Sequence, residues 1–575
     1  MAGDASSAAG CAASPALNTV APPALSPASS PLPSAAAPAP TPEVRPHPLP
    51  DERSLALPWA AHHQALGQWP ELLALVQQQR CHAGPHASAA WHARWLLFAA
   101  TALHGLHATE AARTAAAQAA TLAALDADLL DGLMRLHWAL GDDAACLLHA
   151  RTLLALRPGH GAAHAHAALV LHQRDGCAAW PHYQAALTSG ALAPVPGLTH
   201  TLYQAAAWAF DIEAAEALQT RLYAETAAAA PGDDAQRAWL DWQHSFFRFA
   251  IGDYPRAWAL YERRHDHPDI AQSHRFALPR WDGSWPPGLR LLVHGEQGLG
   301  DEIMFASCLP ALLAEAAQHR AQVVLAVKPG LQRLFADSFP ACEVVCHDHI
   351  RGLLADAAGL GVQAHMPLAS LPTLYARSEA DFARNARQPY LRAHPQRVQH
   401  MAQVLDQLRP GWPQRLRVGV AWACQRGKGA LLDSRAIPIE HLQSLQQVDK
   451  ALFISLHNQD HSHELAAAPS FDVLDLGALQ GDFADTAALV HHMDVVIAVD
   501  SSVAHLAGAM GRTVWQPLLR HPDWRHGAPT RQQSLWYAHT RYFRQTHIND
   551  WSDVIARLAQ SLHGAAAQWT PGDPV

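Results

Sequence analysis

Apolar positions between residues 51 and 265 recur at intervals of three and four, which is the period of an amphipathic helix. Turn signals separate segments of helical length. In the clearest unit, which begins near Ala127, Leu140-Gly141-Asp142 forms a turn, and Pro158 closes a period of about 34 residues. The small residues Ala144 and Cys146 follow the turn and allow two helices to approach. The pattern therefore predicts an array of paired helices over residues 51–265.

The pattern changes after residue 265. Short apolar runs of β type, such as 289–294 and 416–422, alternate with loops and helical stretches. This alternation predicts parallel α/β structure. A polar stretch, residues 391–415, interrupts it, so we expect two α/β halves, residues 275–395 and residues 410–565, with a cleft between them.

Residues 1–50 consist largely of Ala, Pro and Ser, with no aromatic residue. Such a segment cannot bury enough apolar surface to fold, so we expect a disordered tail. It lacks the basic start and compact apolar stretch of a secretory signal. The eight cysteines show no short regular spacing, which favours a reducing compartment. We therefore expect a cytoplasmic protein.

Charge and hydropathy exclude two classes of partner. The formal net charge of -9 provides no broad basic face, so we expect no nucleic-acid partner. No uninterrupted apolar run reaches about 18 residues, so we expect no membrane span. The basic residues are almost all arginines. Only Lys328, Lys428 and Lys450 are lysines, which draws attention to each of them.

A glycine-rich loop between a predicted strand and a predicted helix carries the first candidate site. It contains Gly298, Gly300 and Asp301. The loop would place an acid at the carboxyl end of a strand, where open α/β sheets bind ligands. The glycine order matches neither a Walker loop nor the dinucleotide fingerprint. The alternative is structural: Asp301 caps the helix while the glycines make a tight turn.

A second loop follows the apolar strand that ends at Val499. Asp500 leads into Ser501 and Ser502 at a helix start, and His505 lies about one turn further. Backbone N–H groups at such a start can hold phosphate oxygens, and a histidine can add a donor. The alternative is an Asp/Ser cap beside a buried histidine.

Two further clusters carry potential ligand chemistry. Arg426 and Lys428 lie in a glycine-flanked loop directly after a predicted strand, where their charges could neutralise a diphosphate. They could equally be solvated loop charges. Cys342 and Cys346 lie close to histidines, but no second ligand pair accompanies them, so we expect no metal site.

These motifs resemble a known family. The segments 298–302, 435–438, 482–486 and 500–508 are similar to those of tetratricopeptide proteins whose C-terminal domain resembles the heptosyltransferases, the family 9 glycosyltransferases. The resemblance implies a bacterial-type protein with a GT-B domain. This domain has two Rossmann-like halves, with the acceptor chiefly on the first and the nucleotide-sugar on the second.

The resemblance also implies roles for individual residues. Asp301 corresponds to the proposed catalytic base, and Asp500, Ser501 and His505 correspond to donor contacts. Ser502 occupies a position where heptosyltransferases usually have glycine, and Lys428 corresponds only loosely. The resemblance implies transfer with inversion. We expect a metal-independent reaction with no cofactor, in which the nucleotide-sugar is a substrate.

The sequence thus predicts a TPR-like helical array followed by an α/β GT-B-like domain. We expect it to move a sugar from a nucleotide-diphosphate sugar to a protein or saccharide acceptor that the array presents. The competing hypothesis is a non-catalytic TPR scaffold with a degenerate glycosyltransferase domain. Sugar transfer or donor hydrolysis would separate the two.

Overall fold

A computed structural model describes most of the chain after residue 55. The described ranges are 56–83, 87–122, 126–192, 197–229, 232–267, 278–346, 359–424, 435–448, 450–467, 470–521 and 523–571. The expected tail, residues 1–50, lies outside them. The described residues divide into two compact units, which meet in sequence between Glu225 and Thr226.

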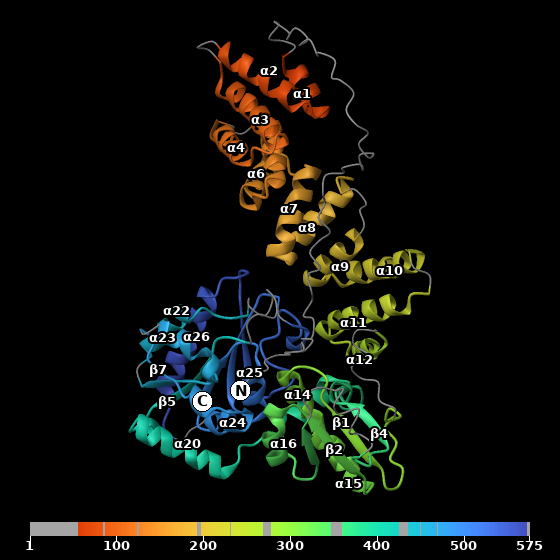
Figure 1. Ribbon diagram of the computed structural model, residues 1–575, viewed down its shortest axis with the longest axis vertical. Helices are drawn as coiled ribbons and strands as arrows, with labels where there is room; N and C mark the ends of the chain where they lie inside the picture. The colour runs from red at the N-terminus through yellow and green to blue at the C-terminus, as the bar shows by residue number, and fades with distance from the viewer. Residues whose placement is uncertain are drawn as a thin grey trace, which may run out of the picture. The chain divides into compact units, whose positions relative to one another are not determined.

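The first unit is an array of antiparallel helix pairs (Figure 1, red to yellow). Its helices are α1 (Ala56–Ala65), α2 (Trp69–Cys81), α3 (Ala89–Gly105), α4 (Thr109–Leu122), α5 (Ala127–Ala139), α6 (Asp143–Leu156), α7 (Gly161–Arg174), α8 (Gly176–Thr188), α9 (Leu198–Trp208) and α10 (Ile212–Ala229). The pairs α5–α6 and α7–α8 reproduce the predicted repeat spacing. The predicted helical array is confirmed.

Small side chains and aspartate caps explain why these helices pair. Ala100 of α3 and Ala116 of α4 are fully buried in one cluster of alanines and leucines, which lets the helices approach closely. The predicted turn at Leu140 is present, with Gly141 at a φ of 71°. Asp142 then caps α6 by accepting a hydrogen bond from the Ala145 N–H at 3.1 Å.

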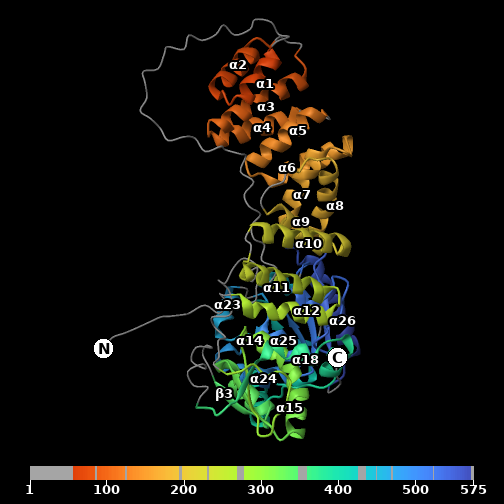
Figure 2. The ribbon, with the colours of Figure 1, turned by 90° about the vertical axis from the view of Figure 1, so that its right-hand side faces the viewer.

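Two more helices, α11 (Asp234–Ala250) and α12 (Tyr254–Tyr261), pack with the second unit (Figure 2). Their aromatic side chains belong to the same buried cluster as the first α/β half. Phe249 of α11 stacks on Trp524 with ring centroids 4.4 Å apart. The sequence pattern places the end of the array at residue 265, whereas the packing boundary falls at residue 225.

The first sheet has the strand order β3-β2-β1-β4 and is parallel throughout. Its strands are β1 (Arg290–His294), β2 (Gln322–Val327), β3 (Glu343–Cys346) and β4 (Ala364–Pro367). Its accompanying helices are α14 (Leu299–Phe305), α15 (Leu309–Gln318), α16 (Gln332–Ser338), α18 (Pro372–Tyr375) and α19 (Glu379–Ala386). The chain leaves β1 toward β2 on one side and returns as β4 on the other. The loop after β1 therefore lies where the strand order reverses.

The second sheet has the order β10-β9-β8-β5-β6-β7 and is also parallel. Its strands are β5 (Leu416–Ala421), β6 (Ala451–Ser455), β7 (Val473–Leu474), β8 (Val495–Ala498), β9 (Thr513–Leu518) and β10 (Thr540–Arg544). Its helices are α20 (Pro395–Leu408), α22 (Ile439–Leu442), α23 (Ser462–Ala467), α24 (Phe483–Val490), α25 (Ser502–Ala509) and α26 (Ser552–Gln568). This is the strand order of a Rossmann fold. The predicted fold class is confirmed.

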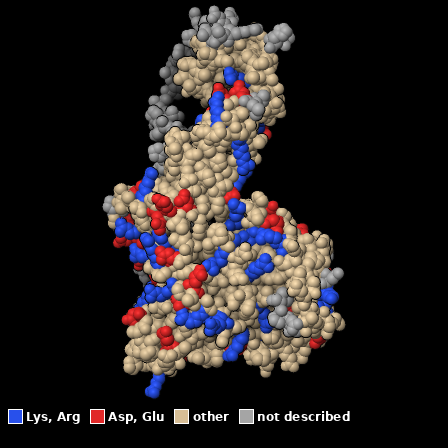
Figure 3. Space-filling model, turned by 180° about the vertical axis from the view of Figure 1, so that it is seen from behind, with Lys and Arg blue, Asp and Glu red and all other residues tan. Residues whose placement is uncertain are grey.

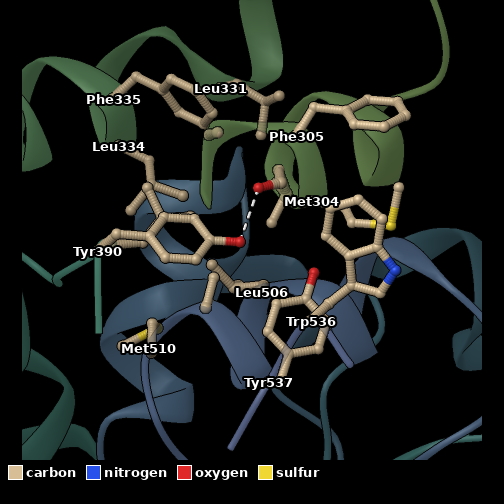
Figure 4. Close-up of a cluster of buried hydrophobic side chains, with 14 of the residues drawn as sticks. Met304, Phe305, Leu331, Leu334, Phe335, Tyr390, Leu506, Met510, Trp536 and Tyr537 are labelled. Atoms are coloured by element: carbon tan, nitrogen blue, oxygen red, sulfur yellow. Dashed lines mark hydrogen bonds between the residues drawn. The ribbon is translucent and has the colours of Figure 1, made fainter. Parts of the chain in front are cut away.

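A buried apolar cluster joins the two halves (Figure 4). Phe305 of α14 and Leu506 of α25 both belong to it, together with Trp536. Tyr390, which lies after α19, donates a hydrogen bond from its hydroxyl to the Ile303 carbonyl at 2.9 Å. This packing holds α14 against α25.

Basic and acidic side chains of the described residues are interspersed over the α/β unit on the face drawn in Figure 3. The described residues on this face therefore form no large patch of a single charge. Among the described helices, none combines the length and the apolar character that crossing a bilayer requires.

Candidate functional site

Two strand-to-helix loops, one from each half, meet in the α/β unit. The loop after β1 leads into α14, and the loop after β8 leads into α25. A Cβ atom built on Gly300 would lie 3.4 Å from the Ser502 Cα and 3.0 Å from the His505 Cδ2. Glycine at this position therefore lets the first turns of the two helices touch. The structure thus brings the two predicted loops together.

Asp301 lies in the first turn of α14, with both of its carboxylate oxygens engaged. Its Oδ2 accepts a hydrogen bond from the Gly298 N–H at 2.9 Å. Its Oδ1 contacts the Arg525 guanidinium, which comes from the other half. The side chain is 14% exposed. Asp301 is thus both a helix cap and one partner of an ion pair between the halves.

Asp500 follows β8 and is surrounded by cationic and imidazole groups. Arg435 places its Nη1 atom 2.8 Å from Asp500 Oδ2. The Nε2 atoms of His526 and His505 lie 3.5 Å and 3.9 Å from Asp500 Oδ1. Burial raises the pKa of Asp500, but Arg435 and the two histidines outweigh burial, so the pKa lies well below its usual range. Asp500 is therefore ionised at neutral pH.

Ser501 and Ser502 begin α25. Ser501 is the N-cap residue in extended conformation, with a φ of -154°. Its side chain makes no capping hydrogen bond, and its buried Oγ atom has no hydrogen-bond partner among the described residues. The first N–H groups of a helix have no acceptor within the helix. This end of α25 therefore carries the donors that an anion needs.

His505 lies one turn into α25 and is 8% exposed. Its Nδ1 atom is 2.9 Å from the Tyr537 hydroxyl oxygen. Burial lowers the pKa of His505 to about 4, although Asp500 opposes this shift. The imidazole is therefore neutral at pH 7 and can offer a hydrogen bond but no charge.

Four residues that complete this cluster have no role predicted from the sequence. Asp523, Arg525 and His526 follow β9, and Arg435 precedes α22. Asp523 Oδ1 is 2.5 Å from the Nη1 atom of Arg525, and its Oδ2 is 3.8 Å from the Nη2 atom of Arg435. Because β5, β8 and β9 are neighbours, residues after their carboxyl ends converge. The signal available in the sequence was the group of charged and imidazole residues at 523, 525 and 526, a few residues after the strand that ends at Leu518.

Arg426 and Lys428, the other predicted donor contacts, fall in residues 425–434, outside the described residues. The assignment of these two side chains remains a prediction.

Glu302, next to Asp301, belongs to a different environment. It is 2% exposed and accepts a hydrogen bond from the Lys328 N–H at 3.1 Å. A Cβ atom on Gly295 would lie 2.1 Å from Glu302 Oε1, so any larger residue there would displace the Glu302 side chain. Burial raises the pKa of Glu302 to about 7, against the opposing charge of Lys328.

Arg435, Asp500 and Asp523 line a small cavity at the carboxyl end of β9. Its volume is about 10 Å³, and Pro517, Leu518, Leu519 and Trp551 form its apolar wall. A cavity of this size holds about one water molecule. The described residues around Asp500 are therefore closely packed.

Comparison with known proteins gives one curated relative. No family model matches the chain. Protein FlbA of Caulobacter vibrioides (strain ATCC 19089 / CIP 103742 / CB 15) is 30% identical over 363 residues, which are 60% of this chain and 58% of FlbA. The chain thus spans less than two thirds of the relative that it matches.

Two kinds of solved structure are similar to the chain. E. coli ADP-heptose lps heptosyltransferase II has a TM-score of 0.36 and 15% identity, covering 49% of this chain and 99% of the enzyme. A tetratricopeptide repeat protein from Parabacteroides merdae has a TM-score of 0.25 and 16% identity, covering 37% of this chain and 79% of that protein. These are the two kinds of protein that the sequence motifs resemble.

Proposed function

We propose that the protein is a metal-independent glycosyltransferase that moves a sugar from a nucleotide-diphosphate sugar to a protein or saccharide acceptor. The observation that carries this proposal is the contact between Gly300 and Ser502. Through this contact, the carboxylate of Asp301 in the first half lies beside the start of α25 in the second half. The start of α25 offers N–H groups that can bind an anion. A transferase needs both groups in one place: a base for the acceptor and donors for the leaving diphosphate.

In the proposed reaction, Asp301 takes the proton of an acceptor hydroxyl as that oxygen attacks the anomeric carbon. The bond between this carbon and the diphosphate oxygen breaks, and the configuration inverts. Base assistance of this kind contributes about 10² to 10⁴ in rate. The sugar is transferred without a metal step, because N–H groups and cations take the charge of the leaving group.

The diphosphate would bind the N–H groups at Ser501 and Ser502. The neutral His505 would add a hydrogen bond, and Asp500 would hold Arg435 in place through the 2.8 Å ion pair. Arg426 and Lys428 would supply further positive charge from their loop. This set favours a nucleoside diphosphate over a neutral leaving group.

The helical array would present the acceptor. Stacked helix pairs form an extended surface suited to holding a chain, whether peptide or saccharide. A nucleotide-sugar substrate and cysteines without a regular spacing both favour the cytoplasm.

A non-catalytic scaffold is the second candidate. The observation in its favour is that both oxygens of Asp301 are engaged, one by the Gly298 N–H and one by Arg525. In a protein that has lost activity, Asp301 would serve only to cap α14 and to join the two halves.

The test is a binding screen followed by a transfer assay. Thermal shift with a panel of nucleoside diphosphates and their sugar conjugates identifies the donor, since a ligand at about 100 times its dissociation constant stabilises by about 2.7 kcal/mol. Donor hydrolysis or transfer is then measured for the wild type and for Asp301→Asn. We expect the variant to lose at least about 10²-fold in rate while it stays folded.

Asp553→Asn is the matched control, because Asp553 also pairs with an arginine, Arg557, at 2.7 Å, but on α26. It should retain full activity. Binding of a nucleoside diphosphate without any hydrolysis or transfer of its sugar conjugates would favour the scaffold.

A further inference from the structure

We infer that Arg525 is a shared cation: it pairs with Asp301 in this structure, and the diphosphate of the donor takes it over, which releases Asp301 to act as base. This inference rests on the proposed function and adds an order of binding to it. The donor must bind before the acceptor can react.

The first support is the position of Arg525 between two carboxylates. It contacts Asp301 Oδ1 through Nη2 and lies 2.5 Å from Asp523 Oδ1 through Nη1. The side chains of Arg525 and Asp523 are 7% and 1% exposed. Burial lowers the pKa of Arg525, but Asp301 and Asp523 outweigh burial and raise it, so the guanidinium stays charged.

The second support is the state of Asp301. An acceptor hydroxyl that gives up its proton must reach an oxygen that Arg525 or the Gly298 N–H now occupies. Freeing Oδ2 would uncap α14, whereas freeing Oδ1 requires only that one arginine side chain turn away. Arg525 is therefore the contact that a ligand can displace.

The third support is that the backbone of Arg525 is firmly anchored. The preceding residue, Trp524, stacks on Phe249 with ring centroids 4.4 Å apart and on Phe246 with centroids 6.0 Å apart. The guanidinium lies 4.9 Å from the Trp524 ring centroid. A side chain on a fixed backbone can exchange one anionic partner for another without rearranging the fold.

The number and arrangement of its oxygens explain why a diphosphate would compete with Asp301 for Arg525. Asp301, Asp500 and Asp523 share two guanidinium groups, Arg435 and Arg525. A diphosphate offers several oxygens in the forked geometry that arginine binds best. Once Arg525 turns to it, the Oδ1 atom of Asp301 is open to accept a hydrogen bond from the acceptor hydroxyl.

The experiment is a double-mutant cycle on diphosphate binding to the full chain. Calorimetry with ADP, UDP and pyrophosphate is run on the wild type, Asp301→Asn, Arg525→Gln and the double variant. Because Asp301→Asn frees Arg525, it should tighten binding by at least about tenfold, the effect of one charge-assisted hydrogen bond. In the Arg525→Gln background, the same substitution should give a clearly smaller gain, which reflects only the relief of repulsion between Asp301 and the anion.

The double variant separates this exchange from simple repulsion. Removing the charge of Asp301 relieves repulsion of the anion whether or not Arg525 is present. An equal gain in both backgrounds would therefore overturn the inference, as would no gain at all. Asp553→Asn should leave affinity unchanged. Arg525→Lys, which keeps the charge, should retain part of the gain and serves if Arg525→Gln does not fold.

The outcomes also separate this inference from the proposed function. If the wild type binds the donor and transfers sugar, but Asp301→Asn does not bind diphosphate more tightly, the transferase proposal is supported and the exchange of Arg525 is contradicted. If only pyrophosphate binds, and Asp301→Asn binds it more tightly only when Arg525 is present, the exchange is supported and the prediction of a nucleotide donor is wrong. Absence of binding in every variant overturns both.

Discussion

The helical array and the α/β unit differ in whether they bury paired charges. In the array, buried His149 and His172 have pKa values that burial lowers to about 4, so these side chains are neutral. The α/β unit buries a neutral histidine too, His505, and it also buries charged pairs. Arg264 and Glu296, both 2% exposed, lie 2.5 Å apart, and Asp523 pairs with Arg525.

This difference locates the chemistry. A buried ion pair seldom stabilises a fold more than an apolar replacement would, because desolvation offsets the attraction between the charges. Burying several such pairs at the ends of β1, β8 and β9 is therefore better explained by a functional site than by stability. The array shows no comparable ion pair among its described residues and relies on alanine packing and helix caps.

The largest expected effect tests where the array ends. A fragment from residue 232 keeps α11 and α12, whereas a fragment from residue 278 loses them and uncovers Trp524. Each buried aromatic side chain contributes about 1.5–3 kcal/mol, and several from these helices lie in the shared core. We expect the longer fragment to fold and bind a nucleoside diphosphate, and the shorter one to melt at least about 10 °C lower or to aggregate.

Calorimetry measures the melting temperature of each fragment and its binding of a nucleoside diphosphate, and light scattering detects aggregation. Equal melting temperatures for the two fragments would mean that α11 and α12 do not stabilise the α/β unit. The boundary between the array and the α/β unit would then lie at residue 265, as the sequence pattern predicts.

The next effect compares a buried ion pair with an exposed one. Arg264 binds Glu296 and also donates to the Ser370 Oγ at 2.9 Å, so the segment after α12 is joined to the loop before Asp301. Arg264→Met leaves Glu296 buried without its cation, so we expect a loss of about 3–5 kcal/mol in unfolding free energy. In the array, Arg221→Met breaks an exposed pair with Glu225 and should cost about 0.3–0.5 kcal/mol.

Urea unfolding measures both losses. The double variant Arg264→Met with Glu296→Met should recover much of the stability, because it leaves no unpaired buried charge. If the double variant were as unstable as the single one, the loss would come from packing instead.

The fold could be predicted because its signals are local. The three-and-four period, the turn at Gly141 and the apolar β runs each lie within a short stretch of sequence. Whether α11 and α12 end the array or join the α/β core depends on what their aromatic residues touch. Phe249 meets Trp524 across a separation that no periodicity reveals.

The part of the site whose signals are local could also be predicted, and the remaining part could not. The loops of Asp301 and Asp500 follow strands, so sequence alone places them at the ligand-binding edge of a sheet. Arg435 and Arg525 reach this edge from other strands. Their pairing with Asp500 and Asp301 depends on the order of strands in the sheet and on the packing of the halves, which a single sequence does not encode locally.

A smaller effect than that of the buried Arg264 pair is expected from acid, which acts on a buried histidine of the array. The pKa of buried His149 is about 4 in the folded array, against 6.5 in solvent, because burial disfavours the charged form. Between these values, the unfolded chain takes up a proton that the folded chain does not. Stability is therefore fully present above pH 6.5 and falls as the pH drops toward 4.

His149→Gln cannot titrate, so the loss of unfolding free energy from pH 7 to pH 5 should shrink by about 1–2 kcal/mol relative to the wild type. His62→Gln, at an exposed position of α1, is the control and should keep the wild-type pH dependence. Urea unfolding at the two pH values measures the difference, and an equal loss in wild type and His149→Gln would show that His149 is not buried as a neutral side chain.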